Sequence, residues 1–206
     1  MCNHIDDTQD DELVARAELY RPEEPEPTEA ELQTLVALEK IRQQATVKVE
    51  EAYRIACRQD PAVTELMKRE WVYAELGVVA IYQDVLLMDP NVVMDMTVSQ
   101  VAFVFRHELA HVLLNHHARE KVFRAGITDP AMLSKAIPAF NAGADLEVNG
   151  SLIDAMIQSG LQYTGVVPGY GAFTNVPVGL TAEEYTTLIL STPELWADIA
   201  HRTGKQ

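Results

Sequence analysis

The chain is organised around Thr97-Val-Ser-Gln-Val-Ala-Phe-Val-Phe-Arg-His-Glu-Leu-Ala-His-Val-Leu-Leu-Asn-His-His-Ala-Arg119. Thr97 and Gln100 form a capping box, T-x-x-Q, which is typical of a helix N-terminus. Apolar residues follow on every side of the predicted helix, which we expect to span about residues 98–119. A helix that is apolar all round belongs in the middle of a core. We therefore expect this helix to be the central, buried element of the fold.

The same helix contains an H-E-x-x-H motif, His107-Glu108-Leu109-Ala110-His111. Residues four apart lie about 40° apart on a helix, so both imidazoles can reach one ion. The glutamate after the first histidine can then lie beside a water molecule on the metal, as in zinc proteases. The motif predicts His107 and His111 as zinc ligands and Glu108 as the catalytic base. The alternative is a pair of core histidines that hydrogen-bond to main-chain or carboxylate groups.

A catalytic zinc ion needs a third protein ligand and an open position for water. The candidates are Asp145 and Glu147, on a helix that we expect over residues 142–158. Asp145 and Asn149 fall near the middle of its apolar stripe, whereas Glu147 points to the opposite side. An unpaired carboxylate on a core-facing stripe is costly, and a zinc ion removes that cost. We expect Asp145 to be the third ligand, with Glu147 as the weaker rival; the alternative is an Asp145 that caps or forms a salt bridge in the core.

Two more histidines, His116 and His117, follow the motif. On a straight helix His116 lies nearly opposite the metal-binding face, and His117 lies well round the side. We expect both to be structural or surface groups.

The remaining pattern predicts an α+β fold that is mainly helical. An apolar stripe predicts a helix from Thr28 to about Cys57, and Asp60-Pro61 should open a second that stops near Gly77. Residues 78–82 and 85–88 are apolar, β-branched and aromatic, which predicts a small antiparallel hairpin. Further helices are expected after Asp129 (ended or bent by Pro138), over 142–158, from Thr181 to about 190, and after Thr192.

Composition limits the function. The formal net charge of -15 argues against nucleic-acid binding and against docking on anionic lipid. No apolar run approaches the roughly 20 residues that cross a bilayer, and no signal peptide pattern is visible. The two cysteines, Cys2 and Cys57, favour a reduced, cytoplasmic setting. Residues 1–27 are acidic and proline-rich, which predicts a flexible arm ahead of a single domain over 28–206.

A family resemblance is carried by His107-Glu-Leu-Ala-His111-Val-Leu-Leu-Asn-His116-His117-Ala-Arg119, by Ala144-Asp145-Leu-Glu-Val-Asn149, by Pro168-Gly169 and by Leu180-Thr-Ala-Glu-Glu184-Tyr185. Over about residues 35–190 the chain resembles the putative metallopeptidase domain found ahead of von Willebrand factor A-like domains. The resemblance implies a zincin-like fold, His107, His111 and Asp145 as metal ligands, and Glu108 as the catalytic residue. The chain departs from the pattern at Asn115, which stands where glycine is common.

We therefore expect a zinc-dependent hydrolase that acts on a peptide or protein substrate. Tyr163, Tyr170 and Tyr185 are candidate donors to the oxyanion, and Val85–Met88 is a candidate sheet edge that aligns an extended peptide. Two other hypotheses stay open. The zinc can be purely structural, in a binding or scaffold protein, or the chain can be an inactive homologue that presents its acidic arm to a partner.

Overall fold

A computed structural model describes residues 27–66, 68–82, 85–160 and 166–204. The chain divides into two compact units, residues 1–40 and 41–206. In the first unit the described residues are 27–40, where helix α2 (Glu29–Gln59) begins. The main-chain N–H of Glu31 donates to Thr28 Oγ1 at 3.3 Å and that of Thr28 donates to Glu31 Oε2 at 2.7 Å, which closes the N-terminus of α2. The predicted acidic arm, residues 1–27, lies almost wholly outside the described residues.

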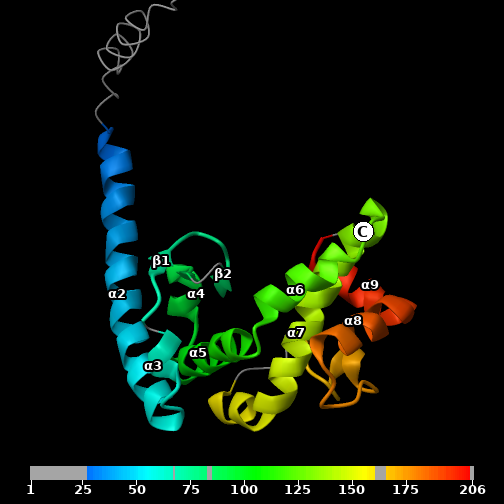
Figure 1. Cartoon of the computed structure of the whole chain (residues 1–206). Coiled ribbons are helices and arrows are strands. Elements are labelled where there is room, and N and C mark those ends of the chain that lie inside the picture. Colours follow the sequence, from blue (N-terminus) through cyan, green and yellow to red (C-terminus); the bar gives the residue numbers. More distant parts are fainter. Residues whose placement is uncertain (1–26, 67, 83–84, 161–165, 205–206) are drawn as a thin grey trace, which may run out of the picture. The chain divides into compact units, whose positions relative to one another are not determined.

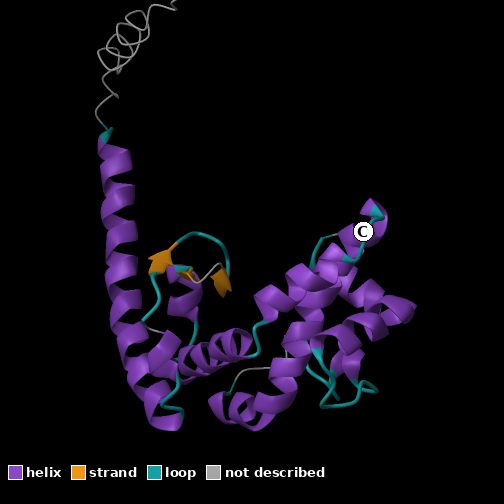
Figure 2. Cartoon of the chain, viewed as in Figure 1, coloured by secondary structure: helices purple, strands orange, loops and turns teal. Residues whose placement is uncertain are grey.

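The second unit contains the remainder of α2 and the elements labelled in Figure 1. Figure 2 distinguishes its helices from three short strands. This architecture confirms the predicted α+β, mainly helical class. The helices that follow α2 are α3 (Val63–Leu66), α4 (Pro90–Asp95), α5 (Val98–Leu113), α6 (His116–Ala125), α7 (Pro130–Ser159), the 3-10 turn η1 (Gly171–Phe173), α8 (Ala182–Ser191) and α9 (Pro193–Arg202).

The sheet has the order β1-β3-β2, with β1 over Trp71–Tyr73, β2 over Val79–Tyr82 and β3 over Val85–Met88. Strands β2 and β3 are antiparallel, as the predicted hairpin requires, although its turn at residues 83–84 lies outside the described part. Strand β1 pairs in parallel with β3, so the predicted helix from Asp60 to Gly77 is wrong beyond Leu66. Its Trp-Val-Tyr sequence is aromatic and β-branched, which suits a strand paired with β3.

The strand order also corrects the predicted sheet edge. Val85–Met88 is the central strand, and β2 lies at the edge. Figure 1 shows β2 above α5, the helix that carries the histidine motif. A peptide cannot add to β3 because both of its sides are already paired.

The central helix is shorter than predicted. It begins at the predicted capping box of Thr97 and Gln100 but ends at Leu113, and α6 starts at His116. Between them Asn115 has φ 54°, in the left-handed region. Asparagine tolerates that region better than most residues with a side chain. The C-terminal end of α5 is also not buried on every side, because Leu113 is 65% exposed.

Helix α7 is longer than predicted, because it runs through Pro138 without ending there. Pro138 is buried, so packing outweighs the main-chain bond that proline removes. Near its middle, a Cβ on Gly143 would lie 2.5 Å from the Ala182 carbonyl oxygen. Glycine at 143 therefore lets α8 approach α7 more closely than any other residue would. The predicted capping box of Thr181 and Glu184 starts α8.

Two groups of buried side chains form most of the core of the second unit. One joins α2, α3, the sheet, α4 and α5, and includes Val49, Leu86 and Phe105. The other joins α7, α8 and α9 around Tyr185 and Ile189. Across the described residues, every helix is too short or too polar to serve as a membrane span.

Candidate metal centre

Three side chains from two helices converge at one point. The Nε2 atoms of His107 and His111, one turn apart on α5, lie 2.9 Å from each other. Asp145 Oδ1, from α7, lies 3.5 Å from His107 Nε2 and 3.3 Å from His111 Nε2. The two histidine side chains are 16% and 20% exposed, and that of Asp145 is 41% exposed. The structure thus brings together all three residues that were predicted as ligands, in a group that could hold a metal ion.

The spacing of these atoms can be compared with that of a zinc site. A tetrahedral zinc ion with bonds of about 2.0–2.1 Å places its ligand atoms about 3.3 Å apart. The three observed separations, 2.9, 3.3 and 3.5 Å, lie around that value. The donor set also fits, because imidazole nitrogen and carboxylate oxygen are both zinc ligands.

The proton on His107 is fixed by Asn149. His107 Nδ1 lies 3.0 Å from Asn149 Oδ1, while the Asn149 amide nitrogen donates to the Val166 carbonyl at 2.8 Å. This second bond identifies Oδ1 as the acceptor, so His107 Nδ1 carries the proton. In the neutral imidazole, Nε2 is left with a lone pair that points at His111 and Asp145. Such a lone pair needs a cation or a proton as its partner.

The electrostatics of the centre favour a positive charge. Burial lowers the pKa of His107, but the hydrogen bond and the negative charge of Asp145 outweigh it, so that the pKa is raised. The protein atoms around the Asp145 carboxyl group raise its pKa, although 41% of the side chain is exposed, yet the contacts with the two histidines outweigh this and bring the pKa well below its usual value. Asp145 is therefore ionised at neutral pH, and its negative charge favours a cation beside it.

Glu108 lies beside the three converging atoms but does not join them. Its side chain is buried, and Oε2 accepts the main-chain N–H of Ile81, in β2, at 3.0 Å. Burial raises the pKa of its carboxyl group, although the two histidines and the Ile81 N–H act in the other direction. A carboxyl group with a raised pKa is suited to take up and release a proton near neutral pH.

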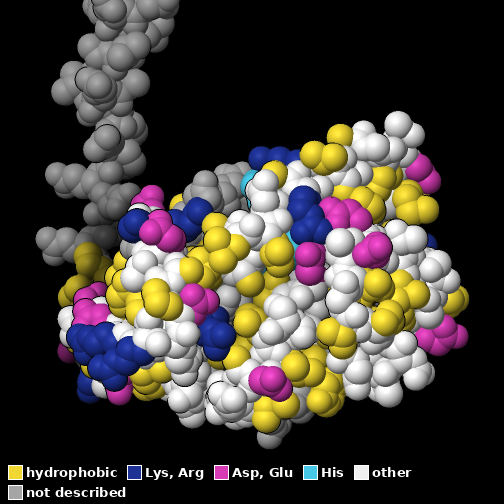
Figure 3. Space-filling model, turned by 60° about the horizontal axis from the view of Figure 1, so that its bottom comes forward, with side chains coloured by type: hydrophobic (Ala, Val, Ile, Leu, Met, Phe, Trp, Pro, Cys, Tyr) yellow, Lys and Arg dark blue, Asp and Glu magenta, His cyan; other side chains and the backbone are white. Residues whose placement is uncertain are grey.

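The centre opens into a cleft of about 910 Å³. Helices α5, α6 and α7 and the edge strand β2 line it, with Val79, Ile81, His107, Glu108, His111 and Asp145 among the lining residues. On the face seen in Figure 3 hydrophobic, basic and acidic side chains are interspersed, and histidine shows only as small areas. The three converging side chains are therefore reached through the cleft.

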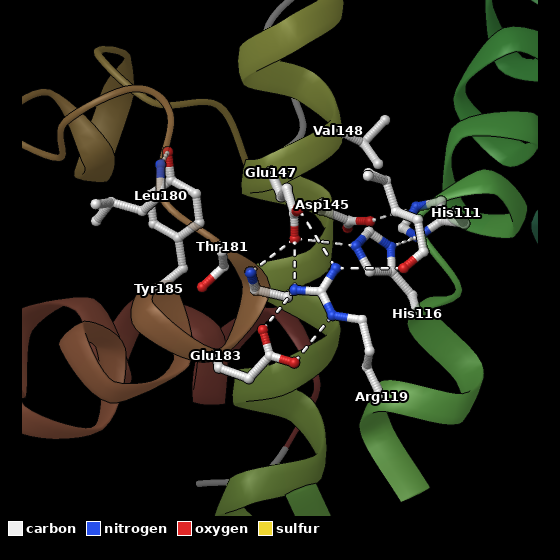
Figure 4. A network of polar contacts seen from close by, with 12 residues as sticks. His111, His116, Arg119, Asp145, Glu147, Val148, Leu180, Thr181, Glu183 and Tyr185 are labelled. Carbon is white, nitrogen blue, oxygen red and sulfur yellow. Dashed lines mark hydrogen bonds and ion pairs between the residues drawn. The ribbon is translucent and has the colours of Figure 1, made fainter. Parts of the chain in front are cut away.

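Glu147, the rival ligand, lies in a different network, shown in Figure 4. Its Oε2 lies 3.1 Å from His116 Nε2 and accepts the Ala182 N–H at 2.7 Å. Arg119 forms ion pairs with both Glu147 and Glu183. Burial raises the pKa of Glu147, but these donors outweigh it and lower the pKa. Glu147 therefore contacts His116 and Arg119, not the three converging atoms.

His116 was predicted to be a structural or surface group away from the metal-binding face. It is buried at 5% exposure, which fits a structural group, but its Nδ1 lies 2.8 Å from His111 Nδ1, so its predicted position opposite the motif is wrong. The break at Asn115 turns His116 towards α5, which a straight helix would not do. The signal in the sequence was Asn115 itself, at a position where the resembled family commonly has glycine. His117 is exposed, as predicted.

The predicted oxyanion donors do not line the cleft within the described residues. Tyr185 is fully buried and its hydroxyl donates to the Pro177 carbonyl at 2.7 Å, so its role is in the α8 core. Tyr170 is 37% exposed, next to η1. Tyr163 lies outside the described residues.

Comparison with known proteins gives one family. A family model described as "Putative metallopeptidase domain" matches residues 44–187. Comparisons with curated proteins and with solved structures find no match. The matched segment is more than half of the chain and contains the sheet, α5, α6, α7 and all three converging residues. The chain therefore belongs to the family described as "Putative metallopeptidase domain".

Proposed function

We propose that this protein is a zinc-dependent peptidase of zincin-like design, with His107, His111 and Asp145 as the metal ligands and Glu108 as the general base. One observation carries the proposal. Three atoms of the ligand types that zinc prefers converge within 3.5 Å of one another beside a buried glutamate in an open cleft. Family membership supports the same reaction class.

In this mechanism Glu108 moves the proton. A bound zinc ion would lower the pKa of a neighbouring water molecule towards about 7 and polarise the substrate carbonyl. Glu108 takes a proton from the attacking water as the new C–O bond forms. It then passes the proton to the amide nitrogen as the C–N bond breaks, so that an acid and an amine are released. The raised pKa of Glu108 suits both transfers.

The edge strand β2 is the proposed binding surface for an extended peptide. Its order in the sheet leaves one side unpaired by other strands, and Val79 and Ile81 line the same cleft as Glu108. An added strand gains main-chain hydrogen bonds that do not depend on sequence. The Ile81 N–H donates to Glu108, so the catalytic base on α5 is hydrogen-bonded to the strand that is proposed to bind the peptide. We also propose a cytoplasmic setting, which the free thiol of Cys57 supports.

The decisive experiment compares Glu108→Gln with Glu120→Gln, its matched control on α6. Zinc-loaded protein is incubated with a randomised peptide library, and products are read by mass spectrometry. We expect wild type and the control to cleave, and Glu108→Gln to lose about 10²–10⁴-fold in rate. Metal analysis should give about one zinc per chain in all three, and none in His111→Ala or Asp145→Ala.

Two results would contradict the proposal. Cleavage that survives in Glu108→Gln removes the base from the mechanism. A zinc-loaded wild type that cleaves no peptide, while it unfolds without zinc, indicates a zinc-stabilised binding or scaffold protein or an inactive homologue.

A further inference from the structure

A chain of polar contacts leads from His111 away from the metal centre to the start of α8 (Figure 4). His111 Nδ1 lies 2.8 Å from His116 Nδ1, and His116 Nε2 lies 3.1 Å from Glu147 Oε2. Glu147 then contacts Arg119 and the Ala182 N–H. The catalytic steps above use none of these outer groups, although the His116 side chain is only 6% exposed and that of Glu147 only 16%.

The positions of the protons in this series of contacts follow from the hydrogen bonds of Glu147, at its outer end. An ionised carboxylate can only accept hydrogen bonds. Glu147 Oε2 accepts the Ala182 N–H at 2.7 Å and an Arg119 N–H at 3.1 Å, and Oε1 accepts a second Arg119 N–H at 3.3 Å. With these donors in place Glu147 acts as a hydrogen-bond acceptor. The proton between His116 and Glu147 therefore belongs to His116 Nε2.

A neutral His116 with its proton on Nε2 has a lone pair on Nδ1. The 2.8 Å contact between the two Nδ1 atoms then requires His111 to donate from its own Nδ1. Nε2 of His111 is left without a proton, directed at His107 and Asp145.

Arg119 holds the Glu147 carboxylate in place by paired hydrogen bonds. The Arg119 guanidinium lies between Glu147 and Glu183, with Nε donating to Glu183 Oε1 at 2.9 Å. The carboxylate of Glu147 therefore already has a cation as its partner.

We propose that His116, Glu147 and Arg119 are positioning residues that fix the tautomer and the ring orientation of the metal ligand His111. The proposal rests on the proposed function, in which His111 Nε2 binds zinc. Carboxylate groups often support metal-bound histidines directly, and losing such an outer partner costs about 10–100-fold in metal affinity. Here a second histidine is interposed, so Glu147 acts on His111 through His116.

The first test reads the tautomer in the wild-type chain. The full-length protein is labelled with ¹⁵N, loaded with zinc, and the imidazole nitrogens are observed by long-range ¹H–¹⁵N NMR at neutral pH. We expect the His116 signals of a neutral ring with its proton on Nε2. A proton on Nδ1 of His116, or on both nitrogens, overturns the proposal.

The second test measures zinc affinity by competition with a chromophoric chelator. We expect His116→Ala to bind zinc about 10–100-fold more weakly, and His117→Ala, the same change at the next position, to bind as wild type does. Glu147→Leu should lose more affinity than Glu147→Gln, which keeps an acceptor for His116. Equal affinity in His116→Ala and His117→Ala contradicts the proposal. Circular dichroism establishes that each variant is folded.

Failure of this inference can be distinguished from failure of the proposed function. If the protein binds zinc with the expected tautomer and affinities but cleaves no peptide, the positioning network is supported and the proposed peptidase function fails. If the protein cleaves peptides but the proton of His116 lies on Nδ1, the proposed peptidase function is supported and the positioning network fails.

Discussion

The close packing of α7 against α8 can be tested by one added methyl group. In Gly143→Ala the new Cβ would lie 2.5 Å from the Ala182 carbonyl oxygen, 2.9 Å from Thr186 Oγ1 and 3.1 Å from the Thr186 nitrogen. The nearest atoms belong to the main chain or to a short side chain, so α8 itself must shift. Over-packing of this kind costs about 1–3 kcal/mol.

Gly150→Ala, in the same helix, is the matched control. Its Cβ would meet Val178 at 3.4 Å and Pro168 at 3.5 Å, which is ordinary van der Waals contact. Both substitutions gain up to about 1 kcal/mol from the better helix propensity of alanine. The net free energy of unfolding should therefore fall by up to about 2 kcal/mol in Gly143→Ala and rise by about 0.5–1 kcal/mol in Gly150→Ala.

The assay is thermal and urea unfolding of both variants beside wild type, followed by circular dichroism. For a chain of this length about 1 kcal/mol moves Tm by about 2–4 °C, so the two variants should shift Tm in opposite directions. Gly143→Ala should also bind zinc more weakly, because a shifted α8 lengthens the 2.7 Å bond from Ala182 to Glu147. Equal stability of the two variants would refute this account of the α7–α8 contact.

Three further predictions concern the metal centre and its surroundings. Zinc at 100 times its Kd should stabilise the chain by about 2.7 kcal/mol, seen as a higher Tm that a chelator reverses and that His111→Ala lacks. The pKa of Glu147 is lowered in the fold from its ordinary 4.5. The ionised Glu147 side chain therefore stabilises the fold above pH 4.5, and this contribution is lost as the pH falls below that value. Urea unfolding across pH 3–7 should therefore show a smaller loss of stability on acidification in Glu147→Gln than in wild type. At Asn115, with φ 54°, substitution by alanine should cost about 1–2 kcal/mol whereas glycine should be tolerated, and urea midpoints that are equal for the two variants would contradict this.

Helical periodicity alone predicted that Asp145, and not Glu147, faces the motif histidines. Two residues turn an α-helix through about 200°, so the two carboxylates must face opposite ways. The structure places Asp145 within 3.5 Å of both motif histidines and Glu147 against His116 and Arg119. In a helix with a strongly periodic apolar pattern and a clear cap, the side towards which each side chain points can be predicted from sequence.

The same reasoning failed where a tertiary contact or one left-handed residue decides the path. Trp71–Tyr73 forms a strand because β3 lies beside it, a partner that no local pattern reveals. Pro138 does not interrupt α7, since it is buried in the packed helix. Leu114 and the left-handed Asn115 separate α5 from α6, and a count of helical turns past these residues misplaced His116.

Helix α7 connects the two supports of the metal centre. Asp145 and Asn149, one turn apart, face α5, where Asn149 holds His107 and Asp145 joins both histidines. Glu147, between them in sequence, faces the other way and reaches His111 only through His116. A displacement of α7 therefore moves Asp145, Asn149 and Glu147 at once. The contact between α7 and α8 at Gly143 lies immediately before these residues, so we expect its integrity to affect metal affinity even though it touches none of the three proposed ligands.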